Sequence, residues 1–130
     1  MTRSGRCLCG SVRYEASGAV RNLCFCHCES CRRGAGAAFV AWGTVDDGSF
    51  RVVAGRLTTV QSSPGVERGF CGACGSSITY RNAKRPAEVD FTLATLDEAA
   101  ALAPRMHIWV QDKLPWVQIT DGLTQHATVP

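Results

Sequence analysis

Short apolar runs separated by turn-forming residues predict a chain built mainly from β-strands. Residues 11–16 alternate with a period of two, which is typical of a strand with one buried face. Residues 38–45 are apolar on both faces and predict a fully buried strand, followed by a turn at 46–48. Further strands are predicted at 50–53, 57–61, 76–80, 89–96 and 107–110. The first two of these flank Gly55 and are expected to form a hairpin.

Helix signals are few. Residues 97–102 have an acidic start, good helix formers and a stop at Pro104, so they predict a short helix. A turn or two of helix is also expected between Cys28 and Ala38, and the tail from Thr120 is expected to be irregular. The 130 residues are expected to form one domain of this mainly β class, spanning 1–130. Its short elements make a modest core, which a metal ion would help to stabilise.

Composition and charge exclude some classes of binding partner. The net charge is only +3, the arginines are scattered, and no polybasic run is present, so nucleic acid is not an expected partner. No apolar run is long enough for a membrane span, and residues 1–7 lack the apolar stretch of a secretory signal. We therefore expect a cytoplasmic protein, in which eight cysteines serve as metal ligands more often than as disulfides.

The first and last cysteine pairs have the spacing of a metal site. Cys7 and Cys9 point to the same face of an extended segment, and Cys71 and Cys74 enclose the tight turn of a zinc knuckle. Together these four thiols predict a closed, structural four-thiolate zinc site. A disulfide framework is the alternative, although bridging within Cys-x-Cys is strained.

The middle cysteines predict a different kind of site. Cys26, Cys28 and Cys31 can converge on one zinc ion and leave a fourth position open, as catalytic zinc sites do. A thiolate-rich site favours a soft ligand, so a thiol substrate is expected. The alternative is a second closed site, completed by Cys24, His27 or His107.

Four stretches together resemble the GFA/CENP-V family, named after the glutathione-dependent formaldehyde-activating enzyme. They begin at Gly5, Cys26, Arg68 and Leu96, and they read GRCLCGSVRY, CHCESCRR, RGFCGACGS and, with a gap, LD…LAPRMHI. The resemblance runs from Gly5 to about Pro115 and implies the β-tent fold, a stack of small antiparallel sheets. It also implies two zinc ions per chain: a structural one on Cys7, Cys9, Cys71 and Cys74, and a catalytic one on Cys26, Cys28 and Cys31.

The activity implied by the resemblance is that of a carbon–sulfur lyase. The founding enzymes condense formaldehyde with glutathione to give S-hydroxymethylglutathione, so glutathione is the suspected thiol partner here. Alternatives are a zinc-stabilised binding or scaffold domain without catalysis, and a related zinc-thiolate enzyme acting on another small substrate.

Several residues near the middle cysteines are candidates for supporting roles. Arg32 and Arg33 follow the cluster directly and could bind an anionic thiol, or they could form a solvated surface pair. His27 is expected to point away from the metal, and His107 is expected to be a core histidine or a proton-transfer group. The tryptophans are expected in the core or in a pocket wall: Trp42, Trp109 and Trp116.

Overall fold

The computed structural model describes residues 1–130 and is mainly β, as predicted. Its first six strands and the single α-helix run in the order β1 (Thr2–Arg6), β2 (Arg13–Ser17), β3 (Arg21–Cys26), α1 (Glu29–Ala35), β4 (Val40–Asp46), β5 (Phe50–Ala54) and β6 (Thr58–Ser63). The remaining strands are β7 (Val66–Phe70), β8 (Ser77–Asn82), β9 (Glu88–Thr92), β10 (Met106–Ile108) and β11 (Thr124–Gln125). Four 3₁₀ turns, η1 to η4, cover Asp47–Ser49, Leu93–Thr95, Ala99–Ala101 and Val110–Asp112.

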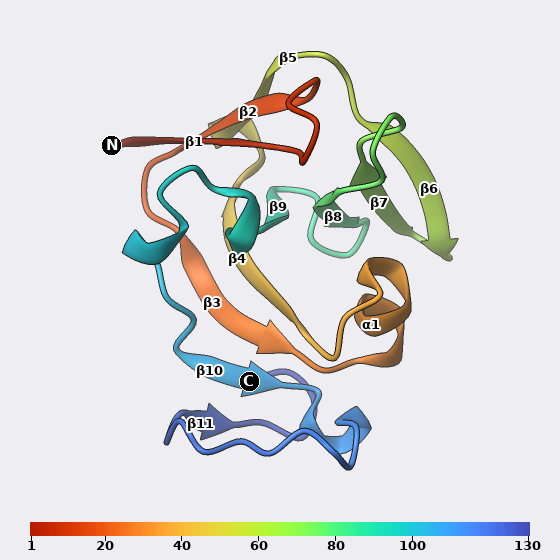
Figure 1. The fold of residues 1–130 in the computed structure, drawn as a ribbon, viewed down its shortest axis with the longest axis vertical. Helices are drawn as coiled ribbons and strands as arrows, with labels where there is room; N and C mark the ends of the chain where they lie inside the picture. The colour runs from red at the N-terminus through yellow and green to blue at the C-terminus, as the bar shows by residue number, and fades with distance from the viewer.

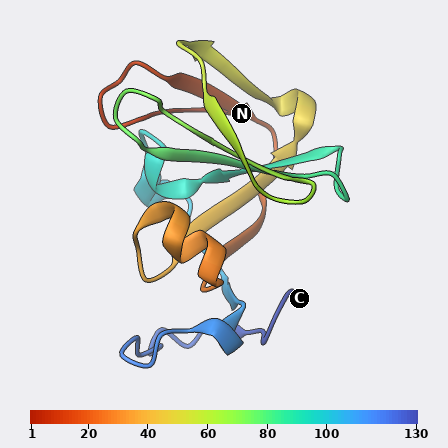
Figure 2. The same cartoon turned by 90° about the vertical axis from the view of Figure 1, so that its right-hand side faces the viewer.

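The strands form two sheets (Figure 1). A three-stranded antiparallel sheet has the order β1-β2-β5, and an eight-stranded sheet has the order β11-β10-β3-β4-β9-β8-β7-β6. Most pairings are antiparallel, but β10 pairs in parallel with both β3 and β11. Figure 2 shows that the C-terminal segment, in blue, lies at the opposite end of the molecule from the three-stranded sheet. The longest helix has seven residues, so no helix of this fold could cross a membrane.

The main core lies between the two sheets. Tyr14 and Phe91 are completely buried, and the Tyr14 ring stacks on Phe50 with a centroid distance of 4.9 Å. The strand predicted at 38–45 is indeed buried on both faces: Val45 packs into this core, whereas Trp42 belongs to a second, smaller cluster with Cys24 and Cys26. The central strands β3 and β4 therefore separate the core from a second compartment.

Three local predictions were wrong. The segments at 50–53 and 57–61 do not form a hairpin, because β5 pairs with β2 in the small sheet while β6 pairs with β7 in the large one. The helix predicted at 97–102 is reduced to the 3₁₀ turn η3, since the backbone N–H of Asp97 donates to Ser4 and Leu96 bridges Gly5. The strand predicted at 89–96 ends at Thr92, where η2 begins.

Candidate metal centre and cavity

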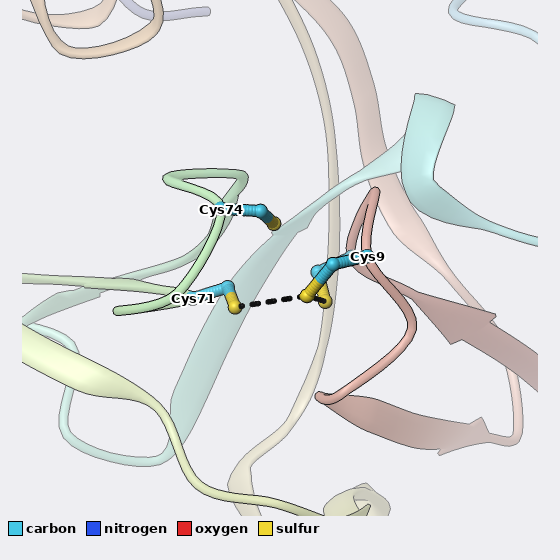
Figure 3. Close-up of side chains that lie close together, drawn as sticks. Cys9, Cys71 and Cys74 are labelled. Atoms are coloured by element: carbon cyan, nitrogen blue, oxygen red, sulfur yellow. Dashed lines mark hydrogen bonds between the residues drawn. The ribbon is translucent and has the colours of Figure 1, made fainter.

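Four thiols from two distant turns converge at one end of the core. The sulfur atoms of Cys7, Cys9, Cys71 and Cys74, hereafter the four-thiol group, all lie within 4.8 Å of one another. Cys9 Sγ is 3.8 Å from Cys71 Sγ, and the thiols of Cys9, Cys71 and Cys74 face a common point (Figure 3). Cys7 and Cys71 are buried, whereas Cys9 is exposed. The four residues predicted to share a metal are therefore brought together by the fold.

The knuckle at residues 71–75 depends on its backbone. The N–H of Gly75 donates to the carbonyl of Cys71 at 2.7 Å, and Gly75 has a φ of +84°, which favours glycine. The Ser76 hydroxyl ties the two turns together, because it accepts the N–H of Leu8 at 2.9 Å and lies 3.3 Å from the sulfur of Cys74. Hydrogen bonding from Ser76 lowers the pKa of Cys74 to about 5, which favours the thiolate form that binds metal.

Three further thiols converge at the end of β3 and the start of α1. The sulfur atoms of Cys26, Cys28 and Cys31, hereafter the trio, also lie within 4.8 Å of one another. Cys28 is the N-cap of α1, and its sulfur accepts the backbone N–H of Cys31 at 3.3 Å. Hydrogen bonds with the thiols of Cys26 and Cys31 lower the pKa of Cys28 to about 2, whereas hydrogen bonds with Cys28 and Cys31 raise the pKa of Cys26. Cys28 is thus the thiol of the trio that most readily carries the negative charge of a metal-binding thiolate, whereas the pKa values of Cys26 and Cys31 are raised.

None of the residues proposed to close the trio belongs to it. Cys24 shares a face of β3 with Cys26 but does not belong to the trio, and burial raises the pKa of its thiol to about 12. The ring of His27 is completely buried, and its Nε2 atom bonds to His107 instead of joining the trio. The ring of His107 in turn contacts Asp121. The trio therefore keeps three sulfur donors.

Both groups fit a divalent metal ion. All eight cysteines are free thiols, so the disulfide alternative does not describe this structure. The donors in each group are sulfur atoms alone, which is the donor set that zinc takes in structural sites and that a soft metal accepts. Four donors complete a tetrahedral shell, whereas three leave a position for another ligand.

The trio opens into a cavity with a volume of about 630 Å³, which is within the usual range for small-molecule sites. Its apolar walls come from β4, β10 and the residue that follows: Trp42, Met106, Ile108 and Trp109. Polar side chains also line it: Asn22, Thr44, Tyr80, Asn82, Arg85 and Asp90. Val129 and Pro130 complete the wall from the C-terminal segment.

The charged groups of the cavity differ from those expected. Neither Arg32 nor Arg33 lines it; Arg33 is exposed and pairs with Glu29 at 2.9 Å, as a surface residue would. Arg68 lines it instead, with its two terminal nitrogens 3.7 and 3.8 Å from the sulfur of Cys31. Among the tryptophans, Trp42 and Trp109 form the pocket wall as expected, but Trp116 is 70% exposed.

Arg68, Ser11 and Ser76 are the neighbours of the thiols that spacing did not single out. Arg68 stands 37 residues from Cys31 and reaches it only because β7 and β8 fold back beside α1. Ser11 lies 3.1 Å from the sulfur of Cys9 and 3.3 Å from that of Cys71. For Ser11 and Ser76 the clue in the sequence was their position two residues after a cysteine of the same group, whereas no local signal pointed from Arg68 to Cys31.

Comparisons with known proteins agree with this arrangement. Residues 2–112 match the family described as glutathione-dependent formaldehyde-activating enzyme. An uncharacterised lyase of Schizosaccharomyces pombe is 32% identical over 84 residues, which is 63% of this chain. The match spans 61% of that relative's length.

The fold is also found in a crystal structure of a Rhodobacter sphaeroides protein. The TM-score is 0.62 at 24% sequence identity, and the superposition covers 95% of this chain and 98% of the other. At that identity the likeness concerns the fold alone. The family match spans both cysteine groups, and the chain belongs to the glutathione-dependent formaldehyde-activating enzyme family.

Proposed function

We propose that this protein is a zinc-dependent carbon–sulfur lyase that joins a small thiol to formaldehyde and also catalyses the reverse reaction. Glutathione is the first thiol to test, because the family takes its name from a reaction that depends on it. The relative from Schizosaccharomyces pombe is named a lyase, which supports the same reaction class. The observation that carries the proposal is a group of three thiols, without a fourth protein ligand, at the wall of a cavity.

The chemistry is an addition of sulfur to a carbonyl group. A bond forms between the thiol sulfur and the formaldehyde carbon, the π bond of the carbonyl breaks, and the thiol proton ends on the carbonyl oxygen. A zinc ion held by Cys26, Cys28 and Cys31 would supply Lewis acidity that lowers the pKa of a bound thiol. The second zinc ion is proposed for the four-thiol group, with a structural role.

The side chains around the trio perform the other tasks. Trp42, Met106 and Ile108 present an apolar wall that limits the water around the reacting sulfur. Cys24 lies in the same cavity but remains protonated at neutral pH, so it does not compete as a nucleophile. Holding the thiol and the aldehyde side by side gives the rate advantage of proximity.

The test is exchange spectroscopy by proton NMR on a mixture of glutathione and formaldehyde, which measures how fast the free thiol and its adduct interconvert. Zinc-loaded wild type should accelerate formation and breakdown of the hydroxymethyl adduct, and Cys28→Ser should not. Cys24→Ser is the matched control, since it removes a thiol from the same cavity but not from the trio. Full acceleration by Cys28→Ser, or none by the wild type with two zinc ions bound, would overturn the proposal.

A further inference from the structure

Two arginines line the cavity, and they differ in their partners. Arg85 is neutralised, because it pairs with Asp90 at 2.8 Å and with Glu88 at 3.2 Å. Arg68 has no carboxylate within 4.0 Å, so its positive charge forms no ion pair within the protein. It is the cation of this cavity that is free to meet an anion.

Arg68 is held in a defined orientation. It extends from β7 opposite Tyr80 of β8, and its guanidinium carbon lies 5.0 Å from the centre of the Tyr80 ring. Its Nε atom donates to the hydroxyl of Ser62 at 3.1 Å, and its two terminal nitrogens face the sulfur of Cys31. A guanidinium group has five N–H donors, so these contacts leave others available to a ligand.

The acidic side chains of the cavity leave room for an anion beside Arg68. Asp90 is bound to Arg85 and also accepts the hydroxyl of Thr44 at 2.6 Å. Glu29 also lines the cavity but is paired with Arg33, which does not. The remaining carboxylate, Asp112, belongs to the 3₁₀ turn η4 on the C-terminal wall. Arg68 is therefore the charged group of the cavity that contacts a thiol of the trio and has no carboxylate partner.

We propose that Arg68 determines substrate specificity by binding a carboxylate that lies one or two carbon atoms from the substrate sulfur. This inference rests on the proposed function, which places a thiol at the trio. Such a thiol is a neighbour of Cys31, and Arg68 faces Cys31 from 3.7 Å. A carboxylate attached close to the sulfur would then meet the planar fork of donors, which suits two parallel hydrogen bonds.

The substrate class that follows is the small mercaptocarboxylic acids. In glutathione, each carboxylate is separated from the sulfur by a peptide bond and several carbon atoms. It would have to fold back to reach a guanidinium group held beside Cys31. We therefore expect thiols with an adjacent carboxylate to bind more tightly than glutathione.

The test compares mercaptoacetate with 2-mercaptoethanol, a neutral thiol of the same length, by calorimetric titration of the zinc-loaded protein. We expect wild type to bind mercaptoacetate at least about 10-fold more tightly, which is the usual scale for charge-assisted hydrogen bonds. Arg68→Gln should abolish this preference while changing the affinity for 2-mercaptoethanol by less than about 3-fold. Arg68→Lys should retain part of it, since the charge remains but the fork is lost.

Arg33→Gln is the matched control, because it removes an arginine outside the cavity, and it should behave as wild type. Equal affinity of wild type for the two thiols would overturn the inference and leave the proposed function intact. A preference that persists in Arg68→Gln would also overturn it. If neither thiol binds to wild type with both metal sites filled, the proposed function fails as well. Should Arg68→Gln not fold, the wild-type preference and its reduction in Arg68→Lys decide the question.

Discussion

The Nε2 atom of His27 lies 2.8 Å from the Nδ1 atom of His107, although 80 residues separate them. The other ring nitrogen of His107 is 2.7 Å from a carboxylate oxygen of Asp121, which can only accept a hydrogen bond. When the His107 ring is neutral, its Nδ1 atom is then a hydrogen-bond acceptor. The Nε2 atom of His27 therefore carries a hydrogen and is the donor of this hydrogen bond. His27 stands between Cys26 and Cys28 of the trio in the sequence. The two hydrogen bonds hold its ring in place and connect it through His107 to Asp121 in the C-terminal segment.

The first prediction concerns Asp121. Asp121→Ala removes the acceptor of His107 and also of the Leu123 backbone N–H, which donates to Asp121 at 3.0 Å. We expect faster hydrogen exchange at Leu123 and at His126, whose N–H donates to the carbonyl of His107. Asp121→Asn retains an acceptor oxygen and should exchange more slowly than Asp121→Ala. Unchanged exchange in Asp121→Ala would show that the backbone hydrogen bonds alone hold this segment.

The second prediction separates the two thiol groups. Cys71→Ser should prevent stable folding, because a structural zinc ion supplies on the order of 10 kcal/mol of folding free energy. Cys28→Ser should give a folded protein that binds about one zinc ion per chain and lacks activity. Circular dichroism and zinc analysis check both expectations. A well-folded Cys71→Ser protein would contradict the structural role of the four-thiol group.

The third prediction concerns metal removal. A chelator should take zinc from the trio first, since three sulfur donors hold an ion less firmly than four. Activity should therefore disappear with the first equivalent of zinc released, while the circular dichroism signal persists until the second is removed. Simultaneous loss of activity and fold would contradict the division of roles.

The fourth prediction tests the packing of Gly5 against Tyr14. The two residues face each other across β1 and β2, and a Cβ atom at position 5 would overlap the Tyr14 ring. Gly5→Ala should lower the free energy of unfolding by about 1–3 kcal/mol, as overpacked cores do. Gly48→Ala is the control, because its Cβ would meet open space. Denaturant titration measures both, and equal stability of the two variants would refute the close approach.

The fifth prediction concerns stability at alkaline pH. Burial raises the pKa of Tyr14 to about 12, compared with about 10 in the unfolded chain. Between these values the unfolded state loses the proton and the folded state keeps it, so stability falls as pH rises above 10. This loss amounts to roughly 2 kcal/mol by pH 12.

Tyr14→Phe should remove that part of the alkaline loss. The variant should also be less stable at neutral pH by about 1 kcal/mol, since the hydrogen bond to Thr95 is gone. Unfolding at pH 8 and at pH 11 compares the two proteins. An identical alkaline loss in wild type and Tyr14→Phe would show that other groups cause it.

The cysteine groups were predictable because short-range geometry fixes them. Cys26, Cys28 and Cys31 lie within six residues, and the knuckle at Cys71 and Cys74 is a local turn. Pairing across the chain was harder to predict. Nothing near residues 50–61 indicates that β5 and β6 join different sheets, because this depends on which distant strand offers a partner.

Pairing between distant strands also explains why the sequence pointed to the wrong arginines. Arg32 and Arg33 are neighbours of the trio in sequence, yet α1 turns Arg33 towards solvent and leaves neither arginine in the cavity. Arg68 reaches the trio through the pairing of β7 with β8, which the local pattern did not reveal. The strand at residues 66–70 was itself missed, since its alternation includes a glycine and two charged residues.

The two thiol groups close chain loops of very different length. Cys9 and Cys71 are 62 residues apart, whereas the trio spans positions 26 to 31. Because loop-closure entropy grows with the logarithm of loop length, an ion bound by the four-thiol group would lower the conformational entropy of the unfolded chain more than an ion at the trio. The difference is worth about 2 kcal/mol of free energy. Such an ion would act as a cross-link between two distant parts of the chain. An ion at the trio can be exchanged while the path of the chain stays the same.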